Sequence, residues 1–171
     1  MWLVSVYLID GYNLLHQMLD RAAEGHRRTG TGRTRDQRRA EGGSEESGLE
    51  RSGPAVDLEE ERGRLLDRIA SFMGGTSDRA VVVFDSRAQA LQKSESATAQ
   101  VEVYFGSFSR SADSIIEREA YALSAGESVI VVSSDYQLQK TVFRPDVIRQ
   151  SSRQFASDLQ EHTKRIANRQ N

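Results

Sequence analysis

Three aspartate residues each end or closely follow a short apolar run, at Asp10, Asp85 and Asp135. Taken alone, an aspartate in such a place is more often a helix N-cap or a turn residue. If the three runs are parallel strands of one sheet, however, their carboxyl ends lie at the same edge, which is where sites form in open α/β sheets. The sequence therefore predicts a group of carboxylates at one sheet edge.

Two further acids occur in the stretch Ser-Ala-Asp-Ser-Ile-Ile-Glu, residues 111–117. Asp113 and Glu117 are four residues apart, so they share one face if the stretch is helical. Each has an ordinary alternative role: Asp113 would complement the dipole at a helix start, and Glu117 would be an exposed helical residue. We include Asp113 as a fourth member of the predicted group and Glu117 as an additional candidate ligand.

Carboxylates held together repel one another and acquire raised pKa values unless a cation neutralises them. Their oxygens suit a hard divalent ion, Mg²⁺ or Mn²⁺, whereas a zinc site would use histidine or cysteine. The chain has no cysteine, and His16, His26 and His162 show no ligand spacing. The predicted metal ligands are Asp10, Asp85, Asp113, Asp135 and Glu117.

The elements that would position these acids follow a regular pattern. Residues 2–9, 80–84 and 128–132 are continuous apolar runs rich in Val and Ile, typical of parallel strands buried on both faces. Residues 101–105 alternate, which indicates a strand nearer an edge. Strands that alternate with helices predict right-handed crossovers and a layered α/β fold. Helices are predicted over residues 14–19, 58–73, 112–125, 136–143 and 153–168.

Residues 21–56 interrupt this pattern. They contain few large apolar side chains and many Gly, Ser, Arg and Glu residues, so they cannot bury enough surface to offset their ordering entropy. The arginines come first and the glutamates follow; the basic half either contacts phosphate or is simply solvated, and the second interpretation is favoured. The prediction is one domain over residues 1–171 with a disordered insert at about 21–56.

Composition limits the partners and the compartment. The formal net charge of −2 gives no overall attraction to nucleic acid, so such a partner would need a local basic face. The absence of cysteine fits a reducing compartment. The first apolar run ends at Asp10, too early for a signal peptide or a membrane span. We expect a soluble cytoplasmic protein without membrane association.

Four motifs, taken in order, resemble the YacP-like branch of the NYN domains in the PIN-like nuclease group: Asp-Gly-Tyr-Asn, Val-Val-Phe-Asp, the stretch at 111–117, and Ser-Ser-Asp-Tyr. The resemblance covers about residues 2–20 and 56–169. It implies a three-layer α/β/α sandwich with a mainly parallel sheet, and a metal-dependent endoribonuclease with RNA as its partner. By position, the catalytic residues would be Asp10, Asn13, Asp85, Asp113 and Asp135.

The resemblance also leaves two questions open. Some YacP-like proteins act on messenger RNA at the ribosome, so the ribosome is a further candidate partner. The alternative function is a non-catalytic RNA-binding or ribosome-docking module with a vestigial metal site, which the intact set of acids disfavours. A haloacid-dehalogenase-type phosphatase is also disfavoured, because Tyr12 stands where that class needs a second aspartate.

Overall fold

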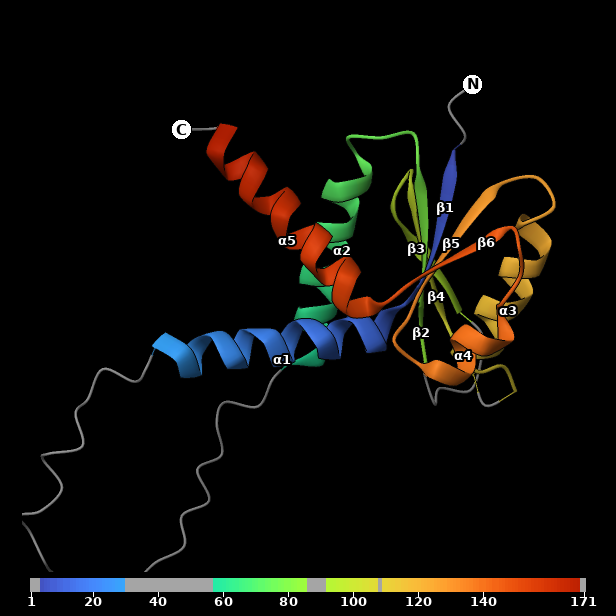
Figure 1. The fold of residues 1–171 in the computed structure, drawn as a ribbon, viewed down its shortest axis with the longest axis horizontal. Helices are drawn as coiled ribbons and strands as arrows, with labels where there is room; N and C mark the ends of the chain where they lie inside the picture. The colour runs from blue at the N-terminus through green and yellow to red at the C-terminus, as the bar shows by residue number, and fades with distance from the viewer. Residues whose placement is uncertain (1–3, 30–56, 86–91, 108, 170–171) are drawn as a thin grey trace, which may run out of the picture.

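The computed structural model describes residues 4–29, 57–85, 92–107 and 109–169. Strands and helices alternate along most of this part of the chain (Figure 1). The strands are β1 (Ser5–Asp10), β2 (Arg79–Phe84), β3 (Gln92–Thr98), β4 (Val101–Phe105), β5 (Ser128–Val132) and β6 (Val147–Gln150). The helices are α1 (Gly11–Thr29), α2 (Leu58–Met73), α3 (Ala112–Leu123), α4 (Tyr136–Thr141) and α5 (Ser152–Arg169).

The strands form one sheet in the order β3-β4-β2-β1-β5-β6. The five neighbouring strands β4, β2, β1, β5 and β6 are all parallel. β3 pairs antiparallel with β4 at one edge of the sheet. Helices α1, α2 and α5 cover one face, while α3 and α4 cover the other (Figure 1). The predicted three-layer α/β/α architecture with a mainly parallel sheet is confirmed.

Each face of the sheet has its own apolar core. On the first face, Ile9 and Phe84 of the sheet pack with Leu65 of α2 and Phe155 of α5. On the second face, Val131 and its neighbours pack with residues of α3 and α4. The central strands are buried on both sides, which explains their continuous Val- and Ile-rich sequences.

Two strands were not predicted from the sequence. β3 has the polar sequence QKSESAT, and it pairs with β4 at the edge of the sheet. β6 has four residues, of which Val147 is buried while Ile148 is 57% exposed. Neither strand contains the apolar run or the regular alternation by which strands are recognised.

Helix α1 is longer than the predicted 14–19, since it runs from Gly11 to Thr29. The prediction of a disordered insert starting at residue 21 is therefore wrong for its first residues. Arg21 contributes to this extension, because its Nη1 donates to Ser157 Oγ at 2.7 Å and to the Arg153 carbonyl at 3.2 Å, both in α5. These polar contacts produce no apolar periodicity in the sequence. The rest of the predicted insert lies outside the described residues.

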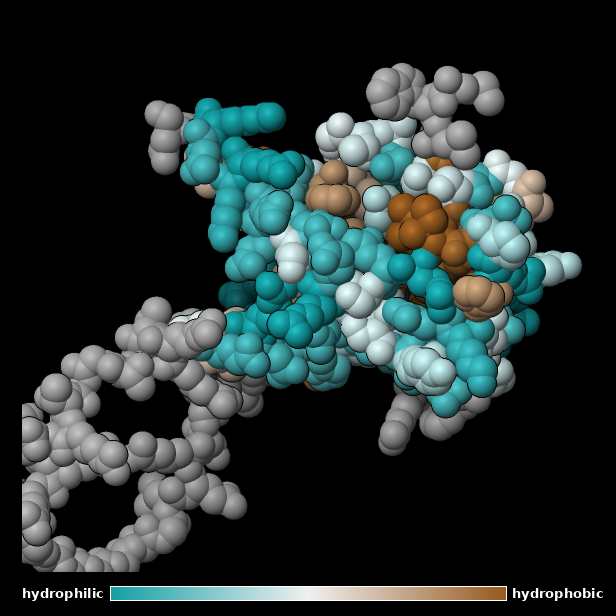
Figure 2. Space-filling view, viewed as in Figure 1, coloured by the Kyte–Doolittle hydropathy of each residue, from teal (hydrophilic) through white to brown (hydrophobic). Residues whose placement is uncertain are grey.

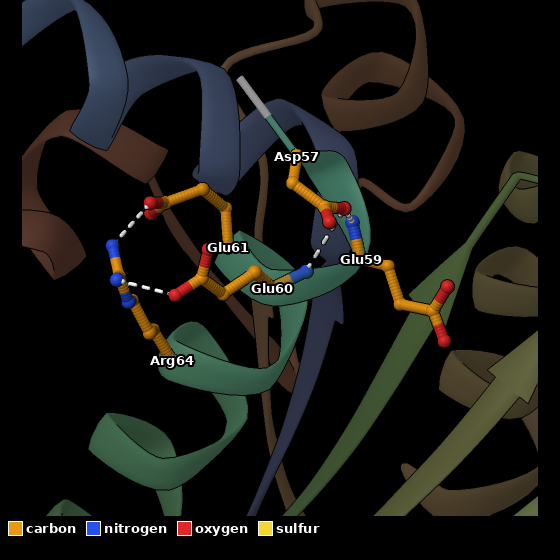
Figure 3. A network of polar contacts seen from close by, with 5 residues as sticks. All are labelled: Asp57, Glu59, Glu60, Glu61 and Arg64. Carbon is orange, nitrogen blue, oxygen red and sulfur yellow. Dashed lines mark hydrogen bonds and ion pairs between the residues drawn. The ribbon is translucent and has the colours of Figure 1, made fainter. Parts of the chain in front are cut away.

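The start of α2 has a clear capping signal. Asp57 is the N-cap and accepts from the backbone N–H groups of Glu59 at 3.0 Å and Glu60 at 3.4 Å (Figure 3). Arg64 then pairs with Glu60 and Glu61, each at 2.6 Å. The cap and the acidic first turn favour a helix start, whereas the exposed ion pairs add little stability.

The outer surfaces of α1 and α5 are mainly polar, as Figure 2 shows, in keeping with helices that bury only one stripe. An apolar patch is visible over the β5 and β6 region, where Ile148 is exposed. Across the described residues, no helix combines the length and apolar character that crossing a membrane requires.

Candidate active site

The three strand-end aspartates lie at the carboxyl edge of neighbouring strands. Asp10 is the last residue of β1, Asp85 follows β2, and Asp135 follows β5 as the N-cap of α4. β1 pairs with β2 on one side and with β5 on the other. The parallel register therefore brings the acids from three separate parts of the sequence to one edge.

A pocket of about 250 Å³ opens at this edge. It contains four of the residues that the sequence predicted for the site, together with two residues of the α3 start and one histidine. Glu117, which is exposed one turn further along α3, and Asp135 are not among its lining residues. The pocket is lined by Asp10, Asn13, His16, Asp85, Ser111, Ala112 and Asp113.

Asp10 is fixed by two hydrogen bonds. Its Oδ1 accepts from the Asn13 backbone N–H at 3.2 Å, and its Oδ2 accepts from Ser133 Oγ at 3.1 Å. Burial raises the pKa of the Asp10 carboxyl above its ordinary value; the two hydrogen bonds oppose this shift, and the charges of Asp113 and Asp135 add to it. Asp10 is thus a rigidly held carboxylate whose negative charge is poorly compensated by the protein.

Ser133 links two of the acids, a role that the sequence did not reveal. Its side chain is fully buried, and its Oγ donates to Asp10 while accepting from the Asp135 backbone N–H at 3.0 Å. Ser133 therefore fixes the end of β1 relative to the start of α4. The only sequence signal is a serine two residues before a strand-end aspartate, which is too common to be diagnostic.

Asn13 connects the loops around the pocket. Its side-chain oxygen accepts from the Ser134 backbone N–H at 2.9 Å and from Ser152 Oγ at 2.7 Å. A backbone N–H can only donate, so the atom facing it must be the amide oxygen, and the two hydrogen bonds occupy both of its lone pairs. These contacts make Asn13 a positioning residue that ties α1 to the starts of α4 and α5. A catalytic role for it stays a prediction.

Asp135 and Asp113 both lie at helix starts. Asp135 is the N-cap of α4, with Oδ1 accepting from Gln137 N at 2.7 Å and Leu138 N at 3.1 Å. This is the alternative role that the sequence left open for strand-end acids. Asp113 lies in the first turn of α3; burial raises its pKa, and the charges of Asp135 and Asp85 raise it further. The four aspartates are therefore electrostatically coupled.

The pocket offers oxygen ligands for a divalent cation. Within the described residues, no three acidic or histidine side chains converge closely enough to form a complete ligand set. Mg²⁺ commonly binds through one or two carboxylates and keeps several waters, so a complete protein ligand set is not required. The uncompensated charges on Asp10 and Asp113 also favour a cation. Mg²⁺ or Mn²⁺ bound through one or two of the carboxylates of Asp10, Asp85 and Asp113, with waters as its other ligands, would suit these oxygen donors.

The raised pKa of Asp113 predicts a pH-dependent cost to folding. The folded state binds this proton more tightly than the unfolded chain, so stability falls as pH rises from the unfolded value, about 3.9, through the folded one. Asp113→Asn should therefore raise the free energy of unfolding near pH 7 by more than it does near pH 4. Urea unfolding in EDTA measures this difference.

The matched control for this test is Asp146→Asn, since Asp146 is exposed and does not line the pocket. An Asp113→Asn protein that is less stable than wild type near pH 7, by a margin that grows with pH, would contradict the expected sign.

The fold agrees with a known class of structure. The crystal structure of Rae1 (YacP) from Bacillus subtilis superimposes with a TM-score of 0.63 at 23% identity, covering 96% of this chain and 78% of that one. A single-site variant of the same protein gives a TM-score of 0.63 at 25% identity, with coverage of 96% and 79%. The α/β/α fold is therefore that of the YacP structures.

Sequence comparison identifies the family. The YacP-like NYN domain matches residues 46–171, which is more than half of the chain. Protein YacP of Bacillus subtilis (strain 168) is 32% identical over 117 residues, which cover 67% of this chain and 68% of that protein. The chain belongs to the YacP-like NYN domain family. Asp10 and Asn13 precede the residues of the family match, and they are included in the site on their geometry.

Proposed function

We propose that this protein is a metal-dependent endoribonuclease that cleaves phosphodiester bonds in RNA with Mg²⁺ or Mn²⁺. NYN domains are generally nucleases. The observation that carries the proposal is the pocket at the carboxyl edge, in which Asp10, Asp85 and Asp113 come together from three different elements. Action on messenger RNA at the ribosome is implied by the family resemblance and stays a prediction.

The residues around the pocket would act mainly by positioning. A bound divalent ion would lower the pKa of a water molecule and offset charge on the scissile phosphate. Asp10, held by Ser133 and by the backbone of Asn13, would present one carboxylate at a fixed angle. Asp85, which follows β2, and Asp113 of α3 would contribute two further carboxylates to the pocket. Attack by water requires no nucleophile from the protein.

The proposal predicts that RNA cleavage depends on the metal. Labelled single-stranded and structured RNAs should be cut when Mg²⁺ or Mn²⁺ is present, uncut in EDTA, and cut again when excess metal is restored. Gel analysis of the products measures this. If RNA binds but stays intact with Mn²⁺ present, the protein is an RNA-binding module instead. Equal cleavage rates with and without EDTA would exclude the metal mechanism.

A further inference from the structure

Two arginine side chains lie over exposed aromatic rings on the α3 and α4 side of the sheet. The Arg144 guanidinium carbon lies 4.4 Å from the centre of the Tyr121 ring, and that of Arg149 lies 4.6 Å from the Phe143 ring. We call these four residues the Arg-aromatic surface. Tyr121 belongs to α3, Arg149 to β6, and the other two to the segment between α4 and β6.

The rings of this surface are unusually exposed, with Tyr121 at 62% and Phe143 at 66%. Exposed apolar side chains also gather on this part of the molecule: of the six large ones in the described residues, four lie on α3, α4, β6 or the segment before β6. Solvent-exposed rings contribute little to folding. Their concentration here therefore indicates an interaction surface.

The arginines of this surface differ from many others in the protein. Arg64, Arg79, Arg118 and Arg165 each pair with a glutamate. Neither Arg144 nor Arg149 forms an ion pair with any of the described residues. A guanidinium that stacks on a ring through its face keeps N–H groups at its edge, and these can bind phosphate.

Helices α3 and α4 connect the Arg-aromatic surface with the candidate active site. Asp113, Glu117 and Tyr121 form an i, i+4, i+8 row along α3, so Tyr121 is about 12 Å along the helix from Asp113 at 1.5 Å per residue. Helix α4 also starts at the site, where Asp135 is its N-cap. Phe143 lies just beyond the end of α4. Buried residues of α3 and α4 pack in the same core.

We propose that the Arg-aromatic surface binds the single-stranded RNA that flanks the cleaved bond. This inference rests on the proposed function for the identity of the ligand. Aromatic rings bind single strands by stacking on unpaired bases, whereas the bases of a duplex already stack on each other. Arg144 and Arg149 supply the local positive charge that a protein with net charge −2 needs near a phosphate backbone.

The test is fluorescence anisotropy of a labelled oligouridylate of about 12 nucleotides, a length within the range of known single-strand sites. EDTA prevents metal-dependent cleavage. Tyr121→Ala and Phe143→Ala should each weaken binding about 5- to 150-fold, the effect of losing one stacked base. Tyr121→Phe, which keeps the ring, should bind like wild type. Circular dichroism checks that each variant is folded.

The arginines are tested through salt dependence. Replacing both Arg144 and Arg149 by alanine should reduce the slope of log affinity against log salt by about 1.4, or about 0.7 for each phosphate contact. The ring variants should keep the wild-type slope. Arg165→Ala on α5, an exposed residue paired with Glu161, is the matched control and should change neither quantity.

The outcomes separate this inference from the proposed function. Unchanged affinity in the double variant Tyr121→Ala, Phe143→Ala would overturn the surface, even if the protein cleaves RNA. Weakened binding in the ring variants would support the surface, even if wild-type protein cuts no RNA with Mn²⁺ present. A wild-type protein that binds no single-stranded RNA would overturn the surface as well.

Discussion

Replacing Asp10 or Asp85 by asparagine is expected to reduce RNA cleavage by about 10²–10³-fold or more, the range seen when one preorganised electrostatic group is removed from an active site. Each substitution keeps the shape of the side chain but removes the negative charge that would hold a divalent cation. The pKa of Asp10 is raised by burial and by neighbouring acids, so loss of its charge relieves repulsion in the metal-free protein. Single-turnover cleavage with Mn²⁺ measures the effect.

Two further variants make this experiment decisive. Asp146→Asn changes an exposed aspartate outside the pocket and should leave cleavage unchanged. Asp135→Asn separates the two roles of that residue, since asparagine is almost as good an N-cap as aspartate and α4 should survive. Activity in Asp135→Asn should fall only if its charge contributes to the site. Turnover near the wild-type rate in folded Asp10→Asn and Asp85→Asn proteins would refute the proposed site.

The acids at the sheet edge could be predicted because strand burial leaves a clear trace in the sequence. A central parallel strand must be apolar along its whole length, so the residue where the run stops marks the carboxyl edge. Asp10, Asp85 and Asp135 were located in this way, and the parallel order of β2, β1 and β5 brings them together. The family resemblance added Asn13 to this set.

The contacts that fix these acids could not be predicted. Ser133 and Asn13 act through hydrogen bonds to residues more than 100 positions away, and such pairings leave no local pattern. β3 lacks the apolar run of a central strand, and α1 contacts α5 through the polar contacts of Arg21, beyond the predicted helix 14–19. The sequence therefore predicts where buried elements end more readily than which polar groups meet there.

Gly11 is required by close packing against a neighbouring ring rather than by a turn of the backbone. A glycine directly after a strand often serves to let the chain turn, yet Gly11 is the first residue of α1. A Cβ atom at this position would lie 2.5 Å from Phe84 Cε1 and 2.6 Å from Cδ1. The Phe84 ring is fully buried and packs against Tyr12, at 5.1 Å between ring centres, and Phe105, at 5.7 Å. Gly11 is needed because α1 starts against this ring.

Gly11→Ala is therefore expected to destabilise the protein by about 1–3 kcal/mol, the usual cost of overpacking a core. It should also reduce cleavage, because Phe84 directly precedes Asp85 and a shift of about 1 Å at an active site can cost about 10²-fold. Gly63→Ala is the matched control, because Gly63 is exposed within α2 and a Cβ atom there would meet nothing within 4 Å. This substitution should raise the free energy of unfolding by about 0.5–1 kcal/mol. Urea unfolding and cleavage rates measure both effects. If Gly11→Ala matches Gly63→Ala in stability and activity, close packing against Phe84 is not what positions Asp10 and Asp85.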